Sequence, residues 1–178
     1  MFLVKIGENA ERDAAMDKDQ LKQETMGLIN QLTDAETNEF HLLVEAMKRK
    51  HQKSSGTYIG ALLQAEGTDG EDEFTLTIPN TALIQNSLNI VHGGITATLA
   101  DSAMGTLAHK ILPGHLAAVT SELKINYTAP GTGSSLSCKA KLIHKGSKTM
   151  LMESRIFRDD GKLMAYSTAT FFIIERKN

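Results

Sequence analysis

The stretch that decides the fold is Asn89–Gly105, NIVHGGITATLADSAMG. A histidine and two glycines lead into a run from Ile95 to Leu112 that is almost entirely apolar, with Asp101 inside it. This run predicts a helix about 27 Å long at ~1.5 Å per residue. The helix should end where a proline and a glycine follow at residues 113 and 114. Because the run is apolar nearly all round, we expect it to be buried on most faces.

Strand patterns lie on both sides of this predicted helix. Before it, TYIGALLQA (57–65) and EFTLTI (73–78) favour two strands, joined by the turn-rich EGTDGED. After it, four strands are predicted over 117–127, 135–146, 148–158 and 162–174, the last pair joined by a turn at Asp160-Gly161. This order predicts an α+β architecture, in which an antiparallel sheet wraps around a long central helix.

Residues 1–51 have a different pattern, which predicts an N-terminal helical extension. Apolar residues recur there at helical spacings, in the two groups Leu21, Met26, Ile29, Leu32 and Phe40, Leu43, Val44, Met47. Thr33 and Glu36 between them have the spacing of a capping box, which starts a helix. We therefore expect a mobile tail over the first fifteen residues, then two helices up to residue 51, and a second domain over 52–178.

Composition excludes several classes of protein. The net charge of −2 and the pI near 6.3 give no support to nucleic-acid binding or to an anionic membrane surface. Polar residues interrupt every apolar stretch before the length of a membrane span, and the start of the sequence lacks the pattern of a secretory signal. Cys138 is the only cysteine, which excludes an internal disulfide. We expect a cytoplasmic enzyme or binding protein.

Gly93 and Gly94 stand where the central helix begins. The first turn of a helix has unpaired N–H groups and a partial positive charge, so it can hold an anion or a developing oxyanion. Glycine lets a ligand approach that backbone closely. The same two glycines are also compatible with a tight turn that has no further role, and the residues alone leave both interpretations open.

Asp101 follows Gly93 by eight positions, which corresponds to ~12 Å along a helix axis. One small reacting group cannot touch both in the same chain. If both residues are catalytic, the site must combine Gly93 of one chain with Asp101 of another, and twofold symmetry then gives two such sites. Asp101 would act as a general base or a nucleophile. The alternative is a structural aspartate whose hydrogen bonds stay within the chain.

Other polar residues give weaker signals. His92 can orient the loop or contact a substrate, and a purely structural hydrogen bond is the alternative. Lys145, Gly146 and Ser147 form a basic turn that can bind a phosphate tail or simply remain solvated. The histidines are scattered without the spacing of metal ligands, so no metal site is predicted.

Together, the motif NxxxxxHGGxxATLxDxAMG, the following VTSELKINYTAP and the final DGKLMAYSTATFFI resemble the hotdog-fold acyl-CoA thioesterases, in the branch of the phenylacetate-pathway enzymes. The resemblance covers about residues 55–175. It implies the hotdog fold, with its sheet around one central helix, and the hydrolysis of acyl-CoA to a free acid and CoA. Residues 1–50 lie outside the pattern.

Carried over by position, the resemblance gives each matching residue a role. Asp101 activates water or attacks the thioester, and the N–H of Gly93 polarises its carbonyl. Asn86 assists at that carbonyl, and Thr120 falls where some relatives have a serine that positions water. His92 and Gly94 are expected to contact the substrate, together with the basic turn at 145–147.

The resemblance also sets expectations about partners. No cofactor beyond the CoA of the substrate is expected, and the predicted assembly is a homodimer that forms a homotetramer. Two alternatives remain open: a non-catalytic acyl-CoA-binding or regulatory hotdog protein, and, less favoured because Gly-Gly follows His92, a hotdog dehydratase.

Overall fold

The computed structural model describes residues 17–176, so the tail predicted for the first fifteen residues lies outside the described part. Two helices follow, α1 (Lys18–Ile29) and α2 (Asp34–His51), as predicted. The capping box is present, because the backbone N–H of Thr33 donates to Glu36 Oε2 at 2.8 Å and the N–H of Glu36 donates to Thr33 Oγ1 at 3.3 Å. The chain forms two compact units that divide between His41 and Leu42, within α2. The predicted domain boundary after residue 51 stays a prediction.

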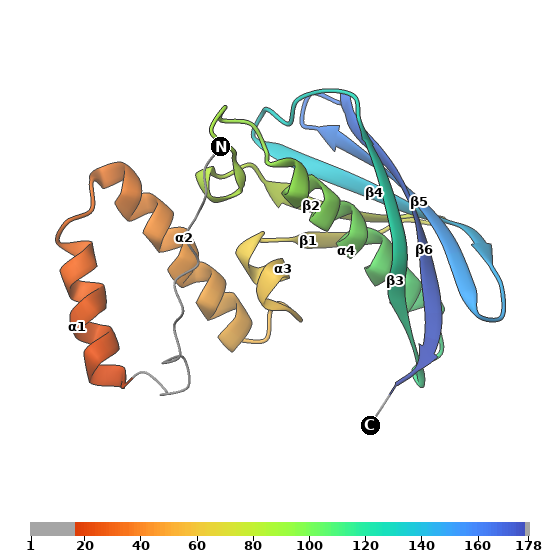
Figure 1. Ribbon diagram of the computed structural model, residues 1–178, viewed down its shortest axis with the longest axis horizontal. Coiled ribbons are helices and arrows are strands. Elements are labelled where there is room, and N and C mark those ends of the chain that lie inside the picture. The colour runs from red at the N-terminus through yellow and green to blue at the C-terminus, as the bar shows by residue number, and fades with distance from the viewer. Residues whose placement is uncertain (1–16, 177–178) are drawn as a thin grey trace, which may run out of the picture. The chain divides into compact units, whose positions relative to one another are not determined.

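The second unit contains one six-stranded sheet and one long helix, α4 (Gly93–Ile111). The strands lie in the order β1-β2-β4-β5-β6-β3 and every neighbouring pair is antiparallel. Figure 1 shows the sheet curving around α4. This confirms the predicted α+β architecture. The strands are β1 (Glu66–Asp69), β2 (Phe74–Pro79), β3 (Leu116–Tyr127), β4 (Ser135–Lys145), β5 (Thr149–Arg158) and β6 (Leu163–Glu175).

The core lies between α4 and the concave face of the sheet. Small residues on the buried side of the helix, such as Ala100, Ala103 and Ala108, allow its backbone to come close to the strands. Larger side chains from the sheet fill the remaining space, and these are Ile78, Leu136, Met150, Met152, Ile156 and Phe171. The helix is thereby held against strands from both ends of the sheet, which fixes the positions of the polar residues that it carries.

The burial expected on most faces of α4 is complete on one face and only partial on another. The fully buried residues are Thr96, Leu99, Ala100, Ala103, Met104 and Ala108, which form one face. On another side Thr98, Asp101 and Ser102 are only partly buried. The apolar composition hid this difference, because small residues such as alanine and glycine are accepted on buried and partly exposed faces alike.

The first predicted strand is also wrong, because residues 58–62 form a short helix, α3 (Tyr58–Leu62). Thr57 caps its start by accepting a hydrogen bond from the N–H of Gly60 at 3.0 Å. Its end is a Schellman turn, in which Gln64 has the left-handed φ of 50° and the N–H of Ala65 donates to the carbonyl of Gly60. Glycine is the usual residue at that left-handed position, so no end signal was visible. A short apolar run fits a helix and a strand equally well.

The strand instead lies in the segment predicted as a turn. Glu66–Asp69 forms β1, which pairs with β2 from Glu66 opposite Thr77 to Asp69 opposite Phe74. All four residues of β1 are exposed, so the segment has no hydrophobic pattern, and it is held by its backbone pairing with β2 and by the ion pair of Asp69 with Lys110 on α4. Among the residues described, no helix has the length and apolar character needed to cross a membrane.

Candidate active site

The N-terminus of α4 is held by His92, which precedes the helix in an extended conformation. Its Nδ1 accepts a hydrogen bond from the N–H of Gly94 at 2.9 Å, so the imidazole serves as the helix cap. The N–H groups of Ile95 and Thr96 both donate to the carbonyl of His92, at 3.0 and 3.1 Å. Three of the four donors in the first turn are therefore occupied.

The remaining donor in that turn is the N–H of Gly93. Within residues 17–176 no atom accepts a hydrogen bond from it. An open N–H at a helix N-terminus is suited to bind an oxygen that carries or gains negative charge. The sequence indicated that either glycine at the helix start could offer its backbone N–H to an anion. In the structure, the N–H of Gly93 is the one that remains open.

Gly93 opens into a hollow of about 370 Å³, here called the Gly93 hollow. It is lined by Asn86, Ile90, Val91, Gly93, Thr96, Tyr127, Ala129, Pro130, Gly131 and Met164. Asn86 is held by a tight turn in which Asn89 has a φ of 56° and donates its N–H to the carbonyl of Asn86. The side-chain oxygen of Asn86 accepts the N–H of Leu88 at 2.9 Å. This leaves the amide NH2 of Asn86 as a second donor beside Gly93.

Tyr127 is a residue of this hollow that the sequence reasoning missed. Its hydroxyl donates to the carbonyl oxygen of Gly93 at 2.7 Å, from the far end of β3. A methyl group on Gly93 would lie 3.3 Å from the same hydroxyl. Tyr127 thus fixes the backbone of Gly93 from the side of the sheet. Its position in KINYTAP, inside the resembling stretch, was the only available signal.

Asp101 lines a separate hollow of about 350 Å³, here called the Asp101 hollow. The surrounding residues are Thr57, Ile59, Ser102, Gly105, Thr106, His109, Ala118, Val119, Thr120 and Phe171. The hydroxyl of Thr120 donates to Asp101 Oδ1 at 2.7 Å, which brings together two of the predicted catalytic residues. A carboxylate with one oxygen held in this way keeps its other oxygen for a water molecule.

Thr120 is positioned by an irregularity in β3. Thr120 lies opposite Phe171 and Glu122 lies opposite Thr170, so Ser121 is an extra residue in the strand. The hydroxyl of Ser121 donates to the carbonyl of Thr170 at 2.9 Å and holds the bulge in place. A β-bulge bends the strand and redirects its neighbouring side chains, which occurs frequently beside active sites.

The two hollows have no lining residue in common. Their key residues, Gly93 and Asp101, lie on the same helix at a spacing of ~12 Å along its axis. The structure therefore brings Asn86 together with Gly93 and Thr120 together with Asp101, but it does not bring these two pairs together within one chain.

The residues of the basic turn predicted at 145–147 lie outside both hollows, and the single cysteine is unreactive. Lys145 is the last residue of β4, Gly146 and Ser147 follow it in the link to β5, and none of the three lines either hollow. Burial raises the pKa of the Cys138 thiol to about 12, although a hydrogen bond with Ser154 opposes this in part. A buried thiol that stays protonated is a poor nucleophile, so Cys138 is not a candidate for covalent catalysis.

Comparisons with known proteins agree with the fold, and the family match covers the helix that carries the candidate residues. A family model described as the thioesterase superfamily matches residues 88–165, which include Gly93, Asp101 and Thr120. The solved structure of the BH2602 protein from Bacillus halodurans with CoA is 35% identical, covers 86% of this chain and 99% of its own, and superposes with a TM-score of 0.79. The chain belongs to the thioesterase superfamily, and its fold is the hotdog fold.

Two curated relatives are also similar over part of their length. A protein of Saccharolobus solfataricus that carries the name of an esterase is 32% identical over 88 residues, which are 49% of this chain and 62% of that relative. The 1,4-dihydroxy-2-naphthoyl-CoA hydrolase of Escherichia coli is 24% identical over 105 residues, which are 59% of this chain and 77% of the enzyme. Both names belong to hydrolases.

Proposed function

We propose that the protein hydrolyses acyl-CoA thioesters at a site built from two copies of the chain. The observation that carries this proposal is the separation of an open oxyanion donor, Gly93 N–H, from a hydrogen-bonded carboxylate, Asp101, on one helix. Thioester hydrolysis needs a base and an oxyanion donor at the same carbonyl. Two chains related by a twofold axis supply both.

The topology of β3 supports this pairing. Within residues 17–176, β3 is paired with β6 on one side only, so its other edge is open. Its first half, at Ala118–Thr120, lines the Asp101 hollow, and its last residue, Tyr127, lines the Gly93 hollow. If two copies of β3 pair in antiparallel fashion, the start of one strand meets the end of the other. The Asp101 hollow of one protomer then faces the Gly93 hollow of its partner.

In the proposed reaction, the free oxygen of the Asp101 carboxylate takes a proton from water while Thr120 holds the other oxygen. The hydroxide adds to the thioester carbon, and the oxyanion is held by the N–H of the partner's Gly93, with the amide of the partner's Asn86 as the second donor. The C–S bond then breaks, and the thiolate of CoA takes up the proton as the acid is released. The CoA bound to the B. halodurans relative supports this substrate class.

The first test replaces the proposed base. Asp101→Asn keeps the shape of the side chain, and we expect it to lower thiol release from acyl-CoA by ~10² or more, the scale of a lost general base. Asp69→Asn is the matched control, since Asp69 is an exposed carboxylate paired with Lys110 and lies outside both hollows. Equal activity of the wild type and Asp101→Asn would overturn the assignment. The homodimer is part of this proposal, and its further assembly into a homotetramer stays a prediction.

A further inference from the structure

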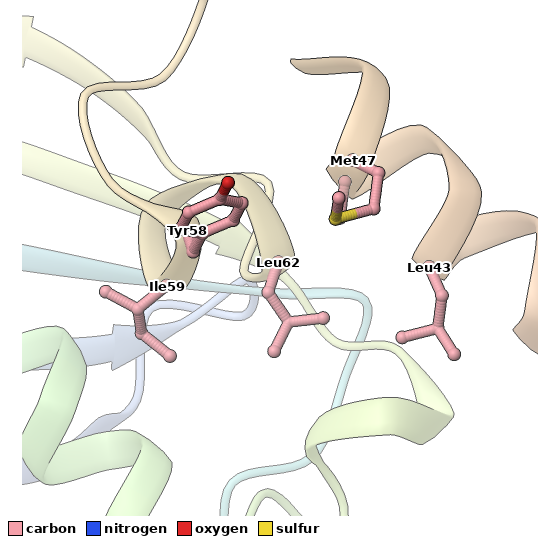
Figure 2. Close-up of a pocket in the computed structure, with 6 residues that line it drawn as sticks. Leu43, Met47, Tyr58, Ile59 and Leu62 are labelled. Carbon is pink, nitrogen blue, oxygen red and sulfur yellow. The ribbon is translucent and has the colours of Figure 1, made fainter. Parts of the chain in front are cut away.

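An apolar groove lies between α2 and α3, within the compact unit that begins at Leu42. It has a volume of about 460 Å³, which is within the ~300–1,000 Å³ range of small-ligand sites. The side chains that line it are Leu43, Ala46, Met47, Tyr58, Ile59 and Leu62. Figure 2 shows Leu62 of α3 facing Leu43 and Met47 of α2 across this groove.

The walls of the groove are tied together by polar contacts at one end. Lys50, near the end of α2, donates to the carbonyl of Gly56 at 2.8 Å, and its ammonium lies 5.3 Å from the centre of the Tyr58 ring. The N–H of Ser54 also donates to the carbonyl of Arg49. These contacts fix the end of α2 against the start of α3, so the groove exists before any ligand binds.

The groove adjoins the Asp101 hollow. Ile59 lines both, and Thr57, which lines the Asp101 hollow, directly precedes Tyr58 of the groove. In Figure 2, Ile59 points away from Met47, on the opposite side of α3. The groove and the Asp101 hollow therefore meet at the side chain of Ile59, the lining residue that they have in common.

We propose that this groove holds the acyl chain of the substrate, so that the protein acts on straight-chain aliphatic thioesters long enough to pass Ile59. This inference rests on the proposed hydrolysis at Asp101. None of the six lining residues is charged, and the Tyr58 hydroxyl is the only polar side-chain atom among them, so a hydroxylated aryl group would lose hydrogen bonds there. Leucine, isoleucine and methionine side chains instead match an aliphatic chain, whose burial improves binding by about fourfold per methylene.

The exposure of the groove is consistent with a ligand site that is open to solvent. Met47 is 59% exposed and Leu43 is 41% exposed, although both are large apolar side chains. Such side chains gathered around one groove mark a surface that an apolar partner covers. Because Ile59 also lines the Asp101 hollow, we expect the apolar partner in the groove to be the acyl chain of the substrate.

The first experiment measures kcat/KM for acetyl-, hexanoyl- and dodecanoyl-CoA with the wild type and with Met47→Lys. Met26→Lys is the matched control, because Met26 is 66% exposed on α1 and does not line the groove. We expect Met47→Lys to lower kcat/KM for dodecanoyl-CoA by about 15-fold or more, the effect of two lost methylene contacts, and to leave acetyl-CoA unchanged.

Two results of this experiment would overturn the groove proposal. One is a change in kcat/KM that is equal for all chain lengths, including no change at all. The other is a shift in the oligomeric state of Met47→Lys, measured by light scattering, without an effect on chain-length preference. That second result would make the groove an interface between copies of the chain.

A binding measurement separates this proposal from the proposed hydrolysis. The protein contains no tryptophan, so Tyr58→Trp introduces a single indole in the groove. We expect its emission to shift to the blue, saturably, with the non-hydrolysable thioether S-dodecyl-CoA but not with CoA, and Met26→Trp to show no shift. A shift without hydrolysis by the wild type would support the groove and reject the hydrolase. Hydrolysis by the wild type without a shift in Tyr58→Trp would support the hydrolase and reject the groove as the site of the acyl chain.

Discussion

The Gly93 hollow and the Asp101 hollow are built on the same helix, but they hold their polar groups in different ways. The Gly93 hollow offers a backbone N–H, fixed by the cap at His92 and by the turn at Asn86. The Asp101 hollow offers a side chain, fixed by Thr120 from a strand that is distant in the sequence. The first is made mostly by local structure, and the second depends on tertiary packing.

The oxyanion donor of the proposed reaction is therefore a backbone group, and its base is a side chain. A backbone donor cannot be removed by most substitutions, because nearly every residue carries the same N–H. The carboxylate of Asp101 is removed by every single substitution except glutamate. The two hollows are therefore to be tested by different kinds of variant.

The largest effect on the Gly93 side is expected from Gly93→Pro. Proline lacks the N–H and is accepted at the first position of a helix. His92, with φ of −60° and ψ of 135°, already has the conformation that a residue before proline adopts. Loss of one oxyanion donor should lower kcat by about 10²–10³.

Gly93→Ala is the matched control for this variant. It keeps the N–H, while its methyl group makes the same close approach of 3.3 Å to the Tyr127 hydroxyl. Steady-state hydrolysis and the thermal midpoint of both variants should be compared. Equal losses of kcat in the two variants would mean that crowding, and not the donor, matters at Gly93.

The second prediction joins the two hollows by complementation. When Gly93→Pro and Asp101→Asn subunits are unfolded together and refolded, mixed dimers contain one doubly altered site and one intact site. Half of the dimers are mixed at equal amounts, so we expect activity to recover to about a quarter of the wild-type value. Each variant refolded alone is the control. Activity that stays at the level of the single variants would place both residues in the same chain's site.

The third prediction concerns the hydroxyl that orients the carboxylate. Thr120→Val keeps the shape and removes the hydrogen bond to Asp101, which should lower kcat by about tenfold, because a hydrogen bond to a charged group contributes ~1.5 kcal/mol. Thr120→Ser retains a hydroxyl and should stay near the wild type. If Thr120→Ser lost as much activity as Thr120→Val, the methyl group of Thr120 would be the important part.

The sequence predicted more of the sheet and of α4 than of the segment before them. Three of the four strands after α4 (β4, β5 and β6) alternate in part, and all four end near turn residues, so their pattern is local and their positions are confirmed. The prediction for residues 57–72 failed because the left-handed residue after α3 is Gln64 and not a glycine, and because all four residues of β1 are exposed. Both features depend on neighbours in space, which a single sequence does not show.

The residues of the candidate site were likewise predicted only where the signal is local in the sequence. Spacing alone separated Gly93 from Asp101, because helix geometry converts eight residues into a distance. Thr120 became a candidate only through the family resemblance, and its contact with Asp101 was not predicted, since nineteen positions separate them and a bulge sets the contact. Tyr127 was missed for this reason too: its partner is a backbone carbonyl 34 positions away, which leaves no pattern in side-chain types.

The smallest effect is expected at Tyr127, where a side chain of β3 stabilises the backbone of the Gly93 hollow. Tyr127→Phe removes a neutral hydrogen bond worth about 1 kcal/mol and keeps the ring, so kcat should fall about fivefold with little change in KM. Tyr166→Phe is the matched control, because the Tyr166 hydroxyl bonds Glu153 and lies outside both hollows.

A loss in kcat only, with an unchanged thermal midpoint, would identify Tyr127 as a positioning residue for the Gly93 N–H. A lower midpoint with unchanged kcat would instead give it a structural role. Addition of Tyr127→Phe to Gly93→Pro should then cost nothing further, since the donor that Tyr127 orients is already absent. The same addition to Asp101→Asn should still lower kcat. The double variants therefore test whether the two hollows act through separate groups.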